Sequence, residues 1–212
     1  MSQSRIVLWR HGRTAWNAEL RWQGQSDIPL DSTGHTQAQA AAPVLAQVSP
    51  AAIYSSDLMR AAVTASYLAK HTGIEVVTDI RLRETNGGLW EGLTQSEIHD
   101  QFAEEVAAWQ KDIALPAGVN GETRDDVASR MCEVIEEKVA LHEGETVVFA
   151  THGGAARAAM MYLLKMPMEL LTTFKVMSNC GWVVLDRDPV RDAWRVSEFN
   201  VTATPPLFES HL

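Results

Sequence analysis

The fold is decided by residues 145–154, which read Glu-Thr-Val-Val-Phe-Ala-Thr-His-Gly-Gly. The apolar run that ends at Ala150 predicts a buried strand, and the glycines after His152 predict a turn into a helix that extends to about Lys165. The sheet would hold a histidine at this place and expose it to a ligand. Glycines that open a helix also expose backbone N–H groups at the positive end of the helix dipole, which is typical of an anion-binding site.

The same arrangement occurs near the beginning of the chain. Residues 5–9, Arg-Ile-Val-Leu-Trp, predict a second buried strand, and Arg10-His11-Gly12 follows it directly. Gly12 lets the backbone turn, and the guanidinium of Arg10 suits a phosphate or a carboxylate. Ligands of open α/β sheets bind outside the carboxyl ends of the strands, so we expect the two histidines to share one site.

Strands and helices alternate along the rest of the chain. Strands are expected at residues 52–55, 75–78, 182–185 and 194–198, the last two paired across a polar turn, and helices at 33–48, 57–71, 94–102 and 123–141. Pro43 predicts a kink or a break in the first of these helices, and Asp57 or Ser56 is expected to cap the second. The pattern predicts an α/β fold with a mainly parallel sheet, in one domain that spans residues 1–212.

Composition narrows the functions open to the chain. Its 212 residues carry 18 basic and 27 acidic side chains, which give a net charge of −9. This balance argues against nucleic acid and an anionic membrane as partners, so an anionic ligand would need positive charge concentrated locally. Apolar stretches fall short of the ~20 residues of a membrane helix, and the N-terminus offers no signal peptide, so we expect a cytoplasmic location. Cys132 and Cys180 are expected to be buried thiols.

Two further segments supply groups that an anion site needs. Residues 55–61, Ser-Ser-Asp-Leu-Met-Arg-Ala, place Arg60 about one turn into a helix, where it can reach back over the strand ends. Residues 82–92, Leu-Arg-Glu-Thr-Asn-Gly-Gly-Leu-Trp-Glu-Gly, place Glu84 in a glycine-rich loop. A carboxylate beside an anion site has the wrong charge for binding and is the right group for proton transfer.

Together these segments resemble the motifs of the histidine phosphatase superfamily, in particular its phosphoglycerate mutase-like branch. The matching residues are Arg10-His11-Gly12 with Thr14 and Asn17, Ser56-Asp57-Leu58 with Arg60, Leu82-Arg83-Glu84 with Gly88 and Trp90-Glu91-Gly92, and His152-Gly153-Gly154. The resemblance implies a three-layer α/β/α sandwich and a phosphohistidine intermediate, with no metal and no cofactor.

The resemblance also implies roles for individual residues. His11 would be the nucleophile and Glu84 the general acid and base, while Arg10, Arg60 and His152 would bind the phosphoryl group. The substrate side of the pocket would include Asn17, Gln23, Gly24 and Gly153. Three other positions are of interest: Trp22 and Trp90 are expected near the cleft, and Arg157 is an open candidate for the site. Gly87 stands where the family usually has a bulkier residue, and it would leave more room for the leaving group.

Several activities remain open. A metal-independent phosphomonoester hydrolase for a small phosphorylated metabolite is favoured over a phosphoglycerate mutase. Mutases hold their bisphosphorylated intermediate with basic residues of a longer insertion, whereas residues 85–151 contain no adjacent pair of arginines. Among phosphatases, the motif spacing most resembles that of actinobacterial glucosyl-3-phosphoglycerate phosphatases, with α-ribazole phosphate and broad-specificity phosphatases as alternatives. A catalytically inactive binding module is disfavoured because His11 and Glu84 are both present. The oligomeric state stays open, and a homodimer is one expectation.

Overall fold

The computed structural model describes residues 3–203 and contains one six-stranded sheet in the order β3-β2-β4-β1-β5-β6. The strands are β1 (Arg5–Arg10), β2 (Ala52–Ser55), β3 (Val76–Thr78), β4 (Thr146–Thr151), β5 (Trp182–Asp188) and β6 (Ala193–Val201). The first four run parallel to one another, and β5 and β6 form an antiparallel hairpin at one edge. The mainly parallel sheet that the sequence predicts is therefore confirmed.

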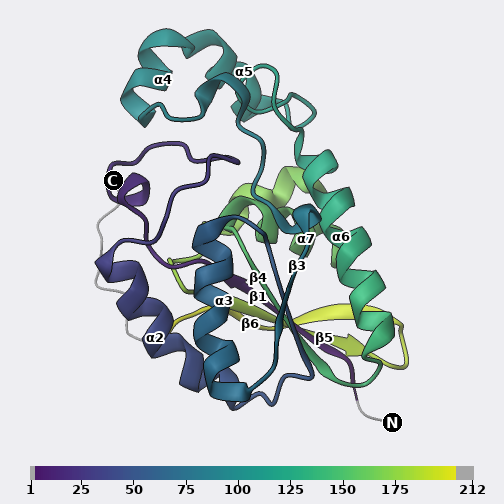
Figure 1. The fold of residues 1–212 in the computed structure, drawn as a ribbon. Helices are drawn as coiled ribbons and strands as arrows, with labels where there is room; N and C mark the ends of the chain where they lie inside the picture. Colours follow the sequence, from purple (N-terminus) through teal and green to yellow (C-terminus); the bar gives the residue numbers. More distant parts are fainter. Residues whose placement is uncertain (1–2, 204–212) are drawn as a thin grey trace.

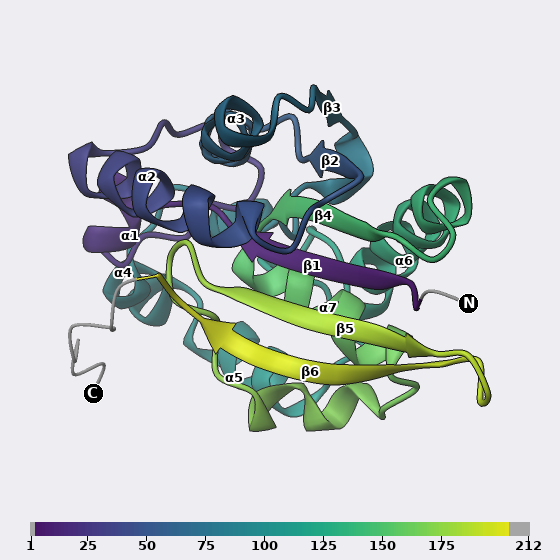
Figure 2. The ribbon, with the colours of Figure 1, turned by 90° about the horizontal axis from the view of Figure 1, so that it is seen from below.

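Helices cover both faces of this sheet. Figure 2 shows α2 (Ser32–Ala46) and α3 (Met59–Thr72) on one face, with α6 (Arg124–Leu141) and α7 (Gly153–Leu163) on the other. Side chains of β1 alternate between the two cores: Val7 and Trp9 pack beneath α2 and α3, and Ile6 and Leu8 pack beneath α6 and α7. Such alternation is expected of a strand that is buried on both faces. The three-layer α/β/α sandwich is confirmed.

A small cap lies beyond the layers, at the top of Figure 1, and contains α4 (Gln95–Gln101) and α5 (Ala103–Lys111). Its own apolar cluster is built around Trp90, Ile98 and Val106. Short elements complete the fold: α1 (Ala15–Ala18) and the 3₁₀ helices η1 (Ile80–Leu82), η2 (Gly88–Trp90) and η3 (Met168–Thr173). The sequence predicts none of these short elements, nor α5.

Helix α2 does not break at its proline. It continues through Pro43 without a break and ends at Ala46. The side chain of Asp31 caps its beginning by accepting a hydrogen bond of 2.8 Å from the backbone N–H of Gly34. Pro43 removes one N–H donor from the ladder, but it lies in the last turn, so only three residues of the helix follow it.

The beginning of α3 corrects a second expectation. Neither Asp57 nor Ser56 caps the helix: its N-cap residue is Leu58, and the backbone N–H of Met59 instead donates to Oδ1 of Asp27, at 2.7 Å. The carboxylate of Asp57 pairs with Arg83. The hydroxyl of Ser56 lies within hydrogen-bond distance of His152, at the predicted site.

Two expectations from composition can be compared with the structure. Cys132 and Cys180 are buried free thiols, as predicted, and burial raises the pKa of each to about 12. Within residues 3–203, no helix is long and apolar enough to span a membrane.

Candidate active site

The two predicted histidines meet where β1 and β4 end. Arg10 lies opposite Thr151 in the parallel register, so His11 and His152 leave the sheet side by side, with ring centroids 5.2 Å apart. Ser56 leaves the adjacent strand β2 at the same edge, and its Oγ lies 2.9 Å from Nε2 of His152. The topology thus places three polar side chains from three parallel strands around one point.

The hydrogen bond of His11 fixes which of its ring nitrogens is free. Its Nδ1 lies 2.7 Å from the carbonyl oxygen of Gly12. A carbonyl can only accept, so Nδ1 carries the proton and Nε2 keeps a lone pair when the ring is neutral. Burial, followed by the charges of Arg60 and Arg10, lowers the pKa of His11 well below its ordinary value of 6.5. At neutral pH the ring is therefore uncharged, and its Nε2 can act as a nucleophile.

His152 is held in a different way. The Oγ of Ser56 already accepts a hydrogen bond from the backbone N–H of Leu58, so its own proton can be donated to Nε2 of His152. The proton of the neutral ring then sits on Nδ1, which is buried and has no partner among the described residues. Burial, followed by the charge of Arg60, lowers the pKa of His152. This histidine offers an N–H donor.

Two buried arginines offer further donors. The Nη1 and Nη2 atoms of Arg60 donate to the carbonyl oxygens of Ser26 and Gly24, both at 2.7 Å, and Nη1 of Arg10 donates to that of Met177. The Nε atom of each arginine is buried without a partner among residues 3–203. Burial lowers the pKa of Arg60 to about 10, so the guanidinium stays charged at neutral pH. Backbone carbonyls hold each side chain while its Nε–H remains available.

The carboxylate of Glu84 lies at the N-terminus of α7. Its Oε2 accepts from the backbone N–H of Gly154 at 3.0 Å, and its Oε1 accepts from that of Ala155 at 2.8 Å. A Cβ at position 154 would come within 2.7 Å of Oε1, so only glycine allows this approach. The sequence predicts that these amides receive an anionic ligand. In the structure the anion that they hold is Glu84 itself.

The predicted substrate-side residues lie around the same edge. The amide oxygens of Asn17 and Gln23 accept from the backbone N–H and the hydroxyl of Thr14, at 3.1 and 3.0 Å, which leaves their NH₂ groups as donors. Gly153 begins α7 close to Arg10, where an added Cβ would lie 3.2 Å from Nε. The structure therefore places these residues beside the segment that follows β1, and their contact with a substrate stays a prediction.

Gly24 holds Arg60 through its backbone. Its φ is +53°, a conformation that favours glycine, and its carbonyl oxygen holds Arg60. An added Cβ would lie 2.0 Å from Oε1 of Glu91. The contacts of Gly24 therefore position the guanidinium.

Glu91 supports the site, although the sequence shows it only as part of a motif. Its carboxylate accepts from the N–H and the hydroxyl of Ser26, at 3.1 and 2.9 Å, and from the N–H of Gly87, at 2.9 Å. It thus ties the segment that holds Arg60 to the loop that follows Glu84. An acidic residue in a glycine-rich loop carries no sequence signal of such a role.

Arg130, on α6, supports Glu84 from behind and is missed by the sequence reading. Its guanidinium donates to the carbonyl oxygens of Arg81, Arg83 and Glu84, at 2.8, 2.7 and 3.0 Å, and pairs with Glu122 at 2.6 Å. Single arginines on amphipathic helices are usually solvated, so only the structure distinguishes this one.

The space beside Gly87 is already filled. An added Cβ at this position would lie 2.1 Å from Nε1 of Trp22, so the expected room for a leaving group is occupied by an indole ring. Trp22 packs edge-on against Trp90 and Trp109, with centroids 5.3 and 5.8 Å away. This aromatic cluster forms a wall next to the loop of Glu84.

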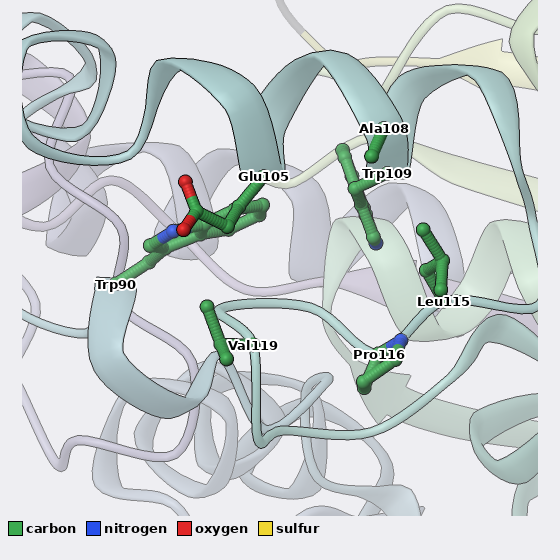
Figure 3. A pocket seen from close by; sticks show the side chains of 7 residues that line it. All are labelled: Trp90, Glu105, Ala108, Trp109, Leu115, Pro116 and Val119. Atoms are coloured by element: carbon green, nitrogen blue, oxygen red, sulfur yellow. The ribbon is translucent and has the colours of Figure 1, made fainter.

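A cavity of about 180 Å³ lies on the cap side of that wall. Figure 3 shows Glu105 and Trp109 of α5 facing Leu115, Pro116 and Val119 of the loop that follows. Among the residues lining it, Trp90 is the one that the sequence places near the cleft. It is mainly apolar and lies apart from the charged groups around His11.

The other histidines lie away from the strand ends. Three of them are exposed: His35, His71 and His99. His142 is half-buried and contacts Tyr54 and Glu145. The expectation that His211 is also a surface or structural residue concerns a position outside the described residues. Within residues 3–203, no group of three or more His, Cys, Asp or Glu side chains could hold a metal ion.

Comparison with known proteins gives the family. The sequence model of the histidine phosphatase superfamily (branch 1) matches residues 6–202. The chain belongs to this superfamily. It is 38% identical to the glucosyl-3-phosphoglycerate phosphatase of Mycobacterium tuberculosis, over 96% of this chain and 97% of the relative. It is 40% identical to the metal-independent phosphoserine phosphatase of Arabidopsis thaliana, over 72% of this chain and 66% of that one.

Solved structures agree with the sequence relatives. The mycobacterial glucosyl-3-phosphoglycerate phosphatase in complex with VO3 has a TM-score of 0.86 and 39% identity to this histidine phosphatase, and the match covers 93% of this chain and 99% of that one. The phosphoglycerate mutase-like fold and the resemblance on the quoted motifs are confirmed. The protein is a phosphatase, that is, a phosphoric monoester hydrolase.

Proposed function

We propose that this phosphatase hydrolyses a small phosphorylated metabolite, with glucosyl-3-phosphoglycerate as the leading candidate, through a phosphohistidine on His11. One observation carries the proposal. Three buried donors without a protein acceptor among the described residues, on Arg10, Arg60 and His152, surround a neutral histidine whose Nε2 is free. An unsatisfied buried donor costs about 1–3 kcal/mol, and the oxygens of one phosphoryl group would satisfy all three.

The chemistry follows from these positions. In the first step Nε2 of His11 attacks phosphorus in line, the bond between phosphorus and the ester oxygen breaks, and Glu84 in its protonated form gives its proton to the leaving oxygen. In the second step water attacks the phosphohistidine, Glu84 takes a proton from that water, and the bond between phosphorus and Nε2 breaks. Arg10, Arg60 and His152 stabilise the charge on the transferred group throughout. No step requires a metal.

The substrate class rests on charge and on relatives. A net charge of −9 repels large polyanions, which favours a small ligand that fits within the local field of the arginines. The mycobacterial relative matches this chain over nearly its whole length and is named for glucosyl-3-phosphoglycerate. A phosphoserine phosphatase also matches, over less of the chain. We further expect the cytoplasm as location, a homodimer as one possible assembly, and neither nucleic acid nor membrane as partner.

A substrate panel tests this proposal. We would compare kcat/KM for glucosyl-3-phosphoglycerate, 3-phosphoglycerate, phosphoserine, α-ribazole phosphate and a phosphotyrosine peptide, and assay mutase activity in parallel. We expect glucosyl-3-phosphoglycerate to be preferred, hydrolysis to exceed mutase turnover, and EDTA to leave the rate unchanged. A preference for the peptide or the ribazole ester would defeat the substrate assignment. Inactivation by EDTA that a divalent ion reverses would defeat the metal-independent mechanism.

A further inference from the structure

Four arginines differ from the others in the part of the chain that the structure describes. Arg10, Arg60, Arg124 and Arg157 form no ion pair there, whereas every other arginine in that part lies within 4 Å of a carboxylate. In a chain with nine more acidic than basic side chains, an unpaired and partly buried arginine needs a reason. Arg10 and Arg60 have one, because they belong to the proposed phosphate site. Arg124 and Arg157 do not.

Arg157 lies immediately beyond Glu84. It is on α7, less than one turn after Gly154 and Ala155, which hold the carboxylate of Glu84. It is half-buried; its Nη2 donates to the carbonyl oxygen of Leu171 at 3.1 Å, and its Nε is buried without a partner among residues 3–203. The arginine is therefore fixed at one end by a backbone carbonyl, as Arg10 and Arg60 are.

Arg124 approaches from the cap. Its guanidinium carbon lies 4.0 Å from the ring centroid of Trp109, its Nη2 donates to the carbonyl oxygen of the same residue at 3.3 Å, and its Nη1 is buried and has no partner in the described structure. Trp109 in turn packs on Trp22, which lies against the loop after Glu84. Burial lowers the pKa of Arg157, the charge of Glu84 raises it and the charge of Arg124 lowers it, in agreement with a position of both arginines beside the Glu84 loop.

Resting on the proposed function, we propose that Arg124 and Arg157 bind a carboxylate of the leaving group, so that the substrates are phosphate esters of hydroxy acids. Glu84 protonates the ester oxygen, and the rest of the leaving group must extend from that oxygen. Arg157 follows, on α7, the two residues whose amides hold the carboxylate of Glu84. Two guanidinium groups provide only donors and positive charge, which a carboxylate matches and a neutral alcohol does not.

A matched pair of substrates isolates this contact. 3-Phosphoglycerate and glycerol 3-phosphate differ in that a carboxylate replaces a hydroxymethyl group, and both carry the same phosphate ester. We expect Arg157→Gln to lower the ratio of their kcat/KM values by about 10- to 100-fold, as the loss of a charge-assisted hydrogen bond would. Arg124→Gln should lower the ratio in the same direction, and Arg157→Lys, which keeps the charge, should restore part of it.

Controls separate this subsite from the phosphate site. Arg191→Gln removes an exposed arginine in the β5–β6 turn, where it pairs with Asp188, and should leave the ratio unchanged. In the wild-type enzyme, glycerate should inhibit hydrolysis of p-nitrophenyl phosphate more strongly than glycerol, a measurement that needs no variant. An unchanged ratio in folded Arg157→Gln, or equal inhibition by glycerate and glycerol, would overturn the subsite while the phosphatase stands. A wild type inactive on every ester would instead overturn the proposed function.

Discussion

The ends of β1 and β4 look alike in sequence and differ in chemistry. Each strand is followed directly by a histidine and a glycine, and the centroids of the two rings are 5.2 Å apart. At the end of β1, the Nδ1–H of His11 donates a hydrogen bond to the carbonyl oxygen of Gly12, and Nε2 keeps its lone pair. At the end of β4, His152 has its Nε2 bonded to Ser56 and its Nδ1 unpartnered among the described residues.

On the proposed roles, the hydrogen-bond partner, and not the histidine itself, decides between nucleophile and phosphate ligand. Both rings are buried in the same positive field, and burial is the largest cause of the lowered pKa in each. What separates them is which nitrogen retains a lone pair and which retains a proton. The carbonyl of Gly12 only accepts and so keeps the proton on Nδ1 of His11, whereas the hydroxyl of Ser56 accepts from the N–H of Leu58 and donates to Nε2 of His152.

Replacing each histidine in turn tests this assignment most severely. His11→Asn should abolish phosphoenzyme formation and lower turnover by about 10⁴-fold or more, the scale on which loss of a nucleophile acts. His152→Asn should slow the reaction but keep acid-labile labelling of the protein by ³²P-labelled substrate. If the label persists in His11→Asn and is lost only in His152→Asn, the roles of the two strand ends are reversed.

A substitution of Glu84 tests whether this residue transfers the proton. Glu84 lies at the β4 end because the first amides of α7 hold its carboxylate. Glu84→Gln should slow hydrolysis of an alkyl phosphate by ~10²–10⁴-fold, the usual weight of general acid–base catalysis. The amide oxygen can still accept from the amides of Gly154 and Ala155, so the fold should survive. With p-nitrophenyl phosphate, whose leaving group scarcely needs a proton, the effect should shrink. An equal loss with both esters would show that Glu84 has a structural role.

Much of this site could be predicted from the chain because its key residues follow strands directly. Buried strands are readable as apolar runs, and a residue at a strand end is positioned by the sheet. His11, Arg10 and His152 belong to this class. Arg60 and Glu84 required the motif resemblance, because a helix arginine or a loop glutamate has no distinctive local signal. Their roles, like the single domain over residues 1–212, stay predictions.

What could not be predicted are contacts between segments distant in the chain. Glu91 bonds Ser26, which is 65 residues away in the chain. Arg130 donates to three backbone carbonyls of the segment that ends at Glu84. Similarly, the cap of α3 comes from Asp27, 32 residues away, and not from its own neighbours. No local periodicity or spacing encodes these pairs, since each depends on how the helices pack on the sheet.

The bond between Ser56 and His152 predicts a smaller effect. Ser56→Ala removes the hydroxyl that fixes the ring, so His152 can take the other tautomer and lose its Nδ1 donor. Loss of one such hydrogen bond should lower kcat/KM by about 3- to 10-fold, with His11 still phosphorylated. Ser66→Ala is a matched control, because Ser66 lies on α3 and bonds only the carbonyl of Val63. No change in Ser56→Ala would show that another contact sets the tautomer.

The smallest expected effect is the change in kcat/KM of the wild-type enzyme in mild acid. Protonation of His11 would occupy Nε2 and stop the attack, and a histidine at its ordinary pKa of about 6.5 would be half inactivated at that pH. Because burial and the charges of Arg60 and Arg10 lower the pKa of His11 well below that value, kcat/KM should lose nothing to histidine protonation between pH 7.5 and 6.5, and should fall only well below it. Arg60→Gln removes one of these charges and should move the acid limb to higher pH, even though its overall rate is lower. The phosphate ester also titrates near pH 6, but it does so equally for both enzymes, so the difference between their profiles reports the protein. An acid limb at the same pH in both would mean that the field of Arg60 does not keep His11 neutral, and the distinction between the two strand ends would then rest on the Gly12 and Ser56 hydrogen bonds alone.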